Sequence, residues 1–110
     1  MIMSQDSYTQ SPISQIGDML DDGLILTDLD GVILSANPAA VRWFGKSLSG
    51  QRIFDVINTS NIGELFAKVA DSAKVSETHY KPTNTIQREF QMRLKRIGDH
   101  SVALLFLDMT

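Results

Sequence analysis

The first hydrophobic pattern in the chain is a pair of short apolar runs with a turn signal between them. Residues 24–28 and 32–36 flank Asp30 and Gly31. An Asp-Gly pair readily adopts the positive φ angles that a tight hairpin turn requires. The pattern therefore predicts an antiparallel β-hairpin.

A short helix is predicted directly after the second run. Asn37 can cap a helix, and Pro38 suits its first position because the backbone N–H there is unpaired in any case. Val41 and Phe44 are three residues apart, and Gly45 offers a left-handed stop at the carboxyl end. The second strand should therefore pass straight into this helix.

The N-terminal region has a different pattern, in which a polar leader precedes a short amphipathic stretch. Residues 1–10 show no periodicity and predict a flexible leader. Within residues 11–22, Ile13, Ile16 and Leu20 recur at helical spacing, which predicts a short amphipathic helix. Its apolar side would either cover the domain's own sheet or pair two copies of the chain.

The middle of the chain carries two further helical patterns. Residues 53–57 suit a single helical turn, because their apolar positions are three and four apart. Residues 61–73 predict the longest helix, which begins with a capping-box-like pairing of Asn61 and Glu64. One side of this helix must be buried, because it carries a continuous apolar stripe of Ile62, Leu65, Phe66, Val69, Ala70 and Ala73.

From Val75 onward the spacing changes to alternation, which is typical of strands. Residues 75–80 form one predicted strand, and Phe90, Met92 and Leu94 alternate with polar residues in the next. Residues 101–108 are almost continuously apolar, as expected for a central strand. The sequence therefore predicts an α+β fold with a five-stranded antiparallel sheet, helices between strands 2 and 3 packed on one face, and a short N-terminal helix.

Composition limits the classes of protein that this chain can represent. Its 110 residues fit one domain, and 43% hydrophobic with 21% charged residues is ordinary for a soluble globular protein. No apolar run approaches the roughly 20 residues needed to cross a bilayer. The net charge of −3 gives little support for nucleic-acid binding. Without cysteine, the cytoplasm is the expected compartment.

No arrangement of residues in the sequence indicates catalysis or metal binding. His79 and His100 have no cysteine partner and fall on predicted strand or turn positions. Asp28 and Asp30 are explained by turn formation, because the ligand spacing of a calcium loop is missing. A glycine-rich phosphate loop is also missing. The sequence therefore predicts a non-catalytic domain with no metal.

The order of elements and three local motifs together resemble a PAS domain. The motifs are the Asp-Gly hairpin, residues 37–40 (NPAA) at the helix start, and residues 108–110 (DMT) after the last strand. The likeness is greatest to PAS domains of sensor histidine kinases of the nitrogen- and phosphate-regulation type, and it extends from about residue 17 to residue 110. It implies a PAS domain at residues 23–110, while the phosphorylated histidine and the ATP site of such a kinase would lie outside it.

The resemblance also implies which cofactors to consider. Flavin photosensing through a thiol adduct and coumaric-acid photosensing both need a cysteine, which this chain lacks. Haem-binding PAS domains usually take an axial histidine from the long helix, and residues 61–73 contain none; His79 lies just beyond and is expected to be a surface strand residue. What remains is a filled core or an apolar pocket for a small ligand, with Leu26, Phe44, Ile53, Phe66, Phe90, Met92 and Phe106 as candidate lining residues.

Two functions follow from the resemblance. In the first, the domain is a sensory module that passes ligand or partner binding to a downstream helical output domain. Asp108 and Thr110 would relay the signal by hydrogen-bonding the first turn of that helix. In the second, the domain binds no ligand and pairs two copies of a regulatory protein through Ile13, Ile16 and Leu20.

Overall fold

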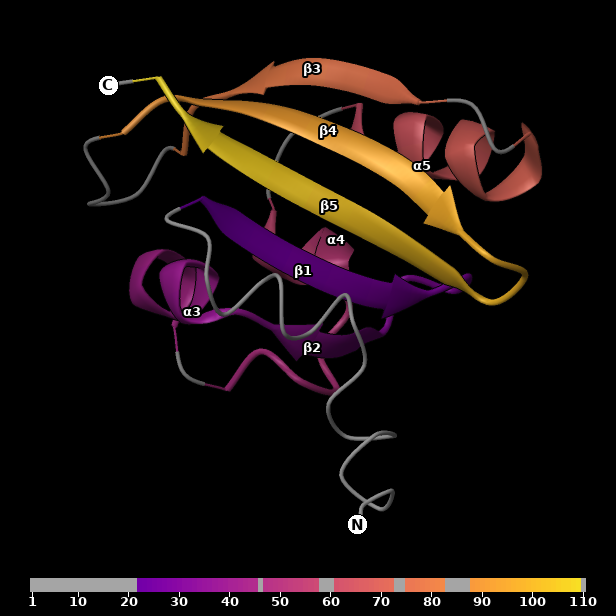
Figure 1. The fold of residues 1–110 in the computed structure, drawn as a ribbon, viewed down its shortest axis with the longest axis horizontal. Coiled ribbons are helices and arrows are strands. Elements are labelled where there is room, and N and C mark those ends of the chain that lie inside the picture. Colours follow the sequence, from indigo (N-terminus) through magenta and orange to yellow (C-terminus); the bar gives the residue numbers. More distant parts are fainter. Residues whose placement is uncertain (1–21, 46, 58–60, 73–74, 83–87, 110) are drawn as a thin grey trace, which may run out of the picture.

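The computed structural model describes residues 22–45, 47–57, 61–72, 75–82 and 88–109, which form a single antiparallel sheet with three helices (Figure 1). The predicted leader, the predicted N-terminal helix with Ile13, Ile16 and Leu20, and also Thr110 lie outside these residues. The elements in chain order are β1 (Gly23–Asp28), β2 (Ile33–Ala36), α3 (Pro38–Phe44), α4 (Ile53–Val56), α5 (Ile62–Ser72), β3 (Ser76–Tyr80), β4 (Phe90–Ile97) and β5 (Ser101–Asp108).

The five strands are ordered β2-β1-β5-β4-β3, and all neighbours are antiparallel. The last strand, β5, lies between β1 and β4 in the middle of the sheet (Figure 1), where its long apolar run predicted a central strand. The three helices of the described residues fall between β2 and β3. The prediction of an α+β fold with this sheet and this placement of helices is confirmed.

The sheet has one inner face, which packs against the helices, and one outer face. Every second residue is buried along β1, from Phe90 to Leu94 of β4 and from Val102 to Phe106 of β5, because successive side chains of a strand point to opposite faces. The inner face presents mostly large apolar side chains, which pack against Ile53, Ile57, Ile62, Phe66 and Val69 of the helical region. The inner-face residues of the three strands are Ile25, Thr27, Phe90, Met92, Leu94, Val102, Leu104 and Phe106.

The hairpin between β1 and β2 is closed as the sequence predicts. Asp28 Oδ1 accepts hydrogen bonds from the backbone N–H groups of Asp30 and Val32, both at 2.9 Å. Gly31 supplies the positive φ of the turn, +88°. Val32 forms an isolated bridge with Arg52, so β2 begins one residue later than predicted.

Substitution by alanine is expected to change the free energy of unfolding in opposite directions at Gly31 and at Gly63. At Gly31 the φ angle is +88°, and an added Cβ would lie 2.7 Å from Phe54 Cε2. Gly31→Ala should therefore lower the free energy of unfolding by about 1–2 kcal/mol. At Gly63, in α5, an added Cβ meets nothing within 4 Å. Gly63→Ala should raise the free energy of unfolding by about 0.5 kcal/mol.

Chemical denaturation of the two variants checks this pair of predictions. Each variant is compared with the wild-type chain under the same conditions, with circular dichroism as the probe. If Gly31→Ala were as stable as the wild type, the turn would not need its left-handed glycine.

The remaining boundaries differ from the predicted ones by a residue or two. The long helix α5 spans Ile62–Ser72 against a prediction of residues 61–73, and β3 starts at Ser76 rather than at residue 75. The buried side chains of α5 are Ile62, Phe66 and Val69, all of which belong to the predicted stripe. The predicted single turn near residue 53 is α4, which is confirmed.

Candidate functional site

A cluster of rings occupies one end of the inner face. The ring centroids of Phe44 and Phe106 are 5.0 Å apart, those of Phe44 and Phe90 are 5.8 Å apart, and those of Phe90 and Phe106 are 6.0 Å apart. Tyr80 lies 6.4 Å from both Phe90 and Phe106. Trp43 adds a fifth ring, 4.9 Å from Phe90. We call these five residues the aromatic cluster.

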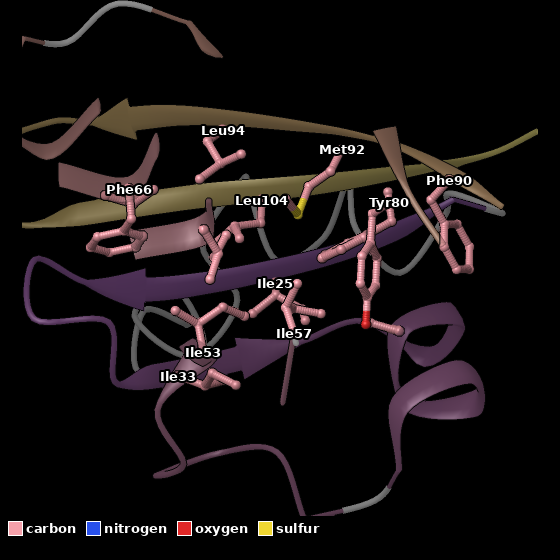
Figure 2. Packing of buried hydrophobic residues seen from close by; sticks show 14 of the residues in the cluster. Ile25, Ile33, Ile53, Ile57, Phe66, Tyr80, Phe90, Met92, Leu94 and Leu104 are labelled. Carbon is pink, nitrogen blue, oxygen red and sulfur yellow. The ribbon is translucent and has the colours of Figure 1, made fainter. Parts of the chain in front are cut away.

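A second, mostly aliphatic group continues the core toward α5. Figure 2 shows Ile25, Ile57 and Met92 between the aromatic end near Phe90 and the far end at Phe66. Phe66 there forms an edge-to-face pair with Phe54, with centroids 5.3 Å apart. The core is therefore one continuous apolar layer, which is aromatic near Phe90, aliphatic in the middle and ends at the Phe54–Phe66 pair.

Six of the seven predicted lining residues meet in this layer. Ile53, Phe66, Phe90, Met92 and Phe106 are buried in one cluster, and Phe44 packs against it. Leu26 does not join them. It pairs with Ala103 on the outer face, while Ile25 pairs with Leu104 and takes the interior position. The prediction for Leu26 was wrong because residues 24–26 are all apolar, so the sequence pattern does not show which of them face the interior.

The layer offers apolar surface and very little polar chemistry. Among the residues that the structure describes, the buried polar or charged ones are Thr27 and Asn37. Thr27 Oγ1 donates to the carbonyl oxygens of Asp28 and Val102. Asn37 is fully engaged with backbone groups, as described below. Such an interior can hold an apolar group or be filled by its own side chains, but these two residues supply no general acid or base.

The histidines and carboxylates lie away from this interior. His79 is exposed on the outer face of β3, with Nε2 3.4 Å from Glu89 Oε2. His100 is exposed in the turn between β4 and β5. Within the described ranges, no three histidine, aspartate or glutamate residues gather as metal ligands would. Among the same residues, no helix is long and apolar enough to span a bilayer.

The start of the sheet is organised by Asn37. Its Oδ1 accepts hydrogen bonds from the N–H of Ala40 at 3.0 Å and from the N–H of Leu24 at 2.9 Å, while its Nδ2 donates to the carbonyl of Asp22 at 2.8 Å. Its own N–H donates to the Leu24 carbonyl. The cap on α3 was predicted. The bonds to residues 22 and 24 were not, because only the folded hairpin brings them near.

The predicted relay residue Asp108 stands at the end of β5, where the described chain leaves the sheet. Its Oδ2 forms a close ion pair with Nη1 of Arg88, just before β4. The next backbone N–H, of Met109, donates to the carbonyl of Glu89 at 2.8 Å. The exit is therefore attached to the start of β4 by a side chain and by the backbone. The other predicted relay residue, Thr110, is not among the described residues.

Sequence reasoning missed Arg88, although a signal for it was present. Asp108 pairs with Phe90 in the β4–β5 register, and Arg88 is two residues earlier on the same side. Counting outward from the turn near Gly98 would have placed Arg88 two residues beyond the partner of Asp108, a diagonal position that a long side chain can reach. No periodic pattern marks it, because it lies outside the strand.

The helix α5 is not brought to Asp108. Its Ala70 carbonyl accepts a hydrogen bond of 2.9 Å from Arg96 Nη1, near the far end of β4. Figure 1 shows α5 beside one end of the sheet and the end of β5 at the other. The helix nearest to Asp108 through side-chain contacts is α3, because Trp43 lies under Arg88.

Comparison with known proteins gives one family and a set of similar folds. The family model described as "PAS domain" matches residues 15–77. No curated protein shows a significant sequence match to the chain. The PAS domain of BvgS from Bordetella pertussis has a TM-score of 0.72 at 15% identity, over 94% of this chain and 88% of that one.

Two further solved structures have the same fold at similarly low identity. A domain of the sensory box sensor histidine kinase/response regulator from Geobacter sulfurreducens has a TM-score of 0.68 at 16% identity, over 92% of this chain and 96% of that one. The PAS domain of the quorum-sensing receptor RpfR from Cronobacter turicensis, solved in complex with C12:0, has a TM-score of 0.68 at 17% identity, over 83% and 96% of the two chains.

Proposed function

This chain belongs to the PAS domain family, and we propose that it is the non-catalytic input module of a two-component sensor histidine kinase. The family model covers more than half of its 110 residues, and PAS domains are generally sensory modules that carry out no reaction themselves. We propose further that the kinase is of the nitrogen- or phosphate-regulation type and acts in the cytoplasm. The kinase catalytic parts would then lie in other domains.

The observation that carries this proposal is the attachment of Asp108 at the exit from the sheet. A carboxylate held by Arg88, followed by a backbone bond from Met109 to Glu89, fixes the direction in which the chain leaves β5. A helix that continued from this point would take its angle from the sheet. A shift of the helices on the inner face, α5 among them, would then change that angle and pass to the output domain through Asp108 and Thr110.

Substitution of Asp108 tests the relay. In the protein that carries this domain, Asp108→Ala should change autophosphorylation, or its response to the signal, by about fivefold or more. Asp99→Ala is the matched control, because Asp99 is 88% exposed in the turn at the other end of β5. Unchanged output and unchanged response in Asp108→Ala would reject the relay.

The sensed molecule is proposed to be a small apolar ligand on the inner face. The support is the apolar layer formed by Phe44, Ile53, Phe66 and their neighbours, together with the RpfR domain of the same fold that was solved with C12:0. No metal, haem or flavin cofactor is proposed. Native mass spectrometry of freshly purified protein, before and after addition of C12:0, tests this point. The absence of any bound mass in both samples would argue against a ligand of this kind.

The alternative function is a ligand-free homodimerisation module. It is favoured by the outer face, where Leu24 of β1 and Leu105 and Leu107 of β5 form a half-buried apolar strip. The segment with Ile13, Ile16 and Leu20 directly precedes β1 in the sequence and would supply the helix that pairs two copies. Sedimentation of the full chain and of one beginning at Asp21 separates the cases. Loss of the dimer on removal supports pairing through this segment, and no change rejects it.

A further inference from the structure

The guanidinium group of Arg88 has two partners. One is the carboxylate of Asp108, with which Nη1 forms a close ion pair. The other is the ring of Trp43 in α3, whose centroid is 5.7 Å from Cζ of Arg88. A planar guanidinium can pair with a carboxylate and stack on a ring at the same time, which an ammonium group does much less well. Arg88 therefore contacts both α3 and the exit of β5.

Trp43 connects Arg88 to the buried core. Its ring centroid lies 4.9 Å from that of Phe90 and 6.5 Å from that of Phe44, so the position of Trp43 depends on its contacts with these two rings. The ring also packs closely on Gly23, where a side chain would collide with it, because a Cβ at that residue would be 2.9 Å from Trp43 Cζ3. A movement of α3 or of the aromatic cluster would therefore move the ring that supports Arg88.

A backbone hydrogen bond also holds the exit. Met109 donates its N–H to the Glu89 carbonyl at 2.8 Å, a bond that side-chain repacking leaves in place. The Arg88–Asp108 pair, in contrast, depends on side-chain positions. Since the Asp108 side chain is 25% exposed and that of Arg88 is 43% exposed, the pair gains little from burial and depends on how well the arginine is oriented.

We propose that Arg88 couples α3 to the C-terminal exit: when Trp43 is packed against Phe90, it orients Arg88 onto Asp108, and when Trp43 shifts, the exit is loosened. The proposal rests on the proposed function in one respect, that the exit carries the signal. The route runs from α3 through Trp43 and Arg88 to Asp108, and it is shorter than a route to Asp108 from α5 at the other end of the sheet. Arg88 is a positioning residue in this route.

The single tryptophan of the chain makes the coupling measurable. In the full chain, Arg88→Gln removes the charge and the stacked plane, and it should increase quenching of Trp43 fluorescence by acrylamide. It should also accelerate hydrogen exchange of the Met109 amide by about fivefold, since exposed ion pairs and cation–π contacts are individually weak. Arg88→Lys should recover part of the slow exchange at Met109, because it keeps the charge, and little of the protection of Trp43.

If Arg88 couples Trp43 to the exit, a substitution at either end should be detected at the other. Asp108→Ala should raise quenching of Trp43, and Trp43→Phe should accelerate exchange at Met109. Arg93→Gln is the matched control, because Arg93 is an exposed β4 arginine paired with Glu77, with Nε 3.0 Å from Oε2. It should leave both readouts unchanged. Circular dichroism confirms that each variant is folded.

The outcomes separate this proposal from the proposed function. Wild-type quenching and wild-type exchange in both Arg88→Gln and Trp43→Phe would overturn the coupling, whatever Asp108→Ala does to output. If both readouts change while Asp108→Ala leaves kinase output unaltered, the coupling stands and the proposed relay fails. A change confined to Trp43, with no change at Met109, would also overturn the proposal.

Discussion

Phe106→Ala is expected to lower the free energy of unfolding by about 3–5 kcal/mol, a large part of the roughly 5–15 kcal/mol that stabilises a domain of this size. The ring is fully buried on the central strand β5, with the ring centroids of Phe44 at 5.0 Å, Phe90 at 6.0 Å and Tyr80 at 6.4 Å. Its removal leaves a cavity that these rings cannot close without moving. Urea denaturation followed by circular dichroism measures the loss.

Leu34→Ala is the control for this substitution. Leu34 is 50% exposed on β2, so its truncation should change the free energy of unfolding by no more than about 0.5 kcal/mol. A loss below about 2 kcal/mol in Phe106→Ala would contradict the tight packing of the aromatic cluster.

Asn37→Ala is expected to cost about 2–3 kcal/mol, far more than loss of an ordinary surface amide. It removes the cap on α3, which is one hydrogen bond to Ala40, and it also deprives the Leu24 N–H and the Asp22 carbonyl of the partners that Asn37 gives them. Asn37 is 6% exposed, so water replaces these bonds poorly. Thermal or urea denaturation gives the difference from wild type.

Asn37→Asp separates the two contributions. The carboxylate keeps an acceptor for Ala40 and Leu24 but donates nothing to the Asp22 carbonyl, so its cost should be about 1 kcal/mol. Equal losses in Asn37→Ala and Asn37→Asp would mean that the donated bond to Asp22 carries the whole effect and that the cap carries none.

Local patterns were enough to predict the elements that contain their own signals. The hairpin turn needs only Asp28, Asp30 and Gly31, which are near one another in sequence, and the start of α3 needs only Asn37 and Pro38. The alternation of Phe90 and Met92 with polar residues likewise identified the buried face of β4 correctly. In each case the information lies within a few residues.

Features that depend on pairing between distant strands were not accessible in this way. Leu26 was assigned to the interior instead of Ile25 because both are apolar, and only the register with β5 decides which one faces the helices. Arg88 was missed for a related reason: it meets Asp108 and Trp43 only when β4, β5 and α3 are assembled. The fold could thus be predicted from sequence more completely than the contacts at its exit.

The central claim is that a signal leaves the domain through the contact between Arg88 and Asp108. Output of the protein that carries this domain, measured as autophosphorylation if it is the proposed kinase, tests it most directly when wild type, Arg88→Gln, Asp108→Ala and the double variant are compared. Each single change should shift output in the same direction, and the double variant should match Asp108→Ala, because both changes remove one contact. Wild-type output and response in all three variants would contradict the claim.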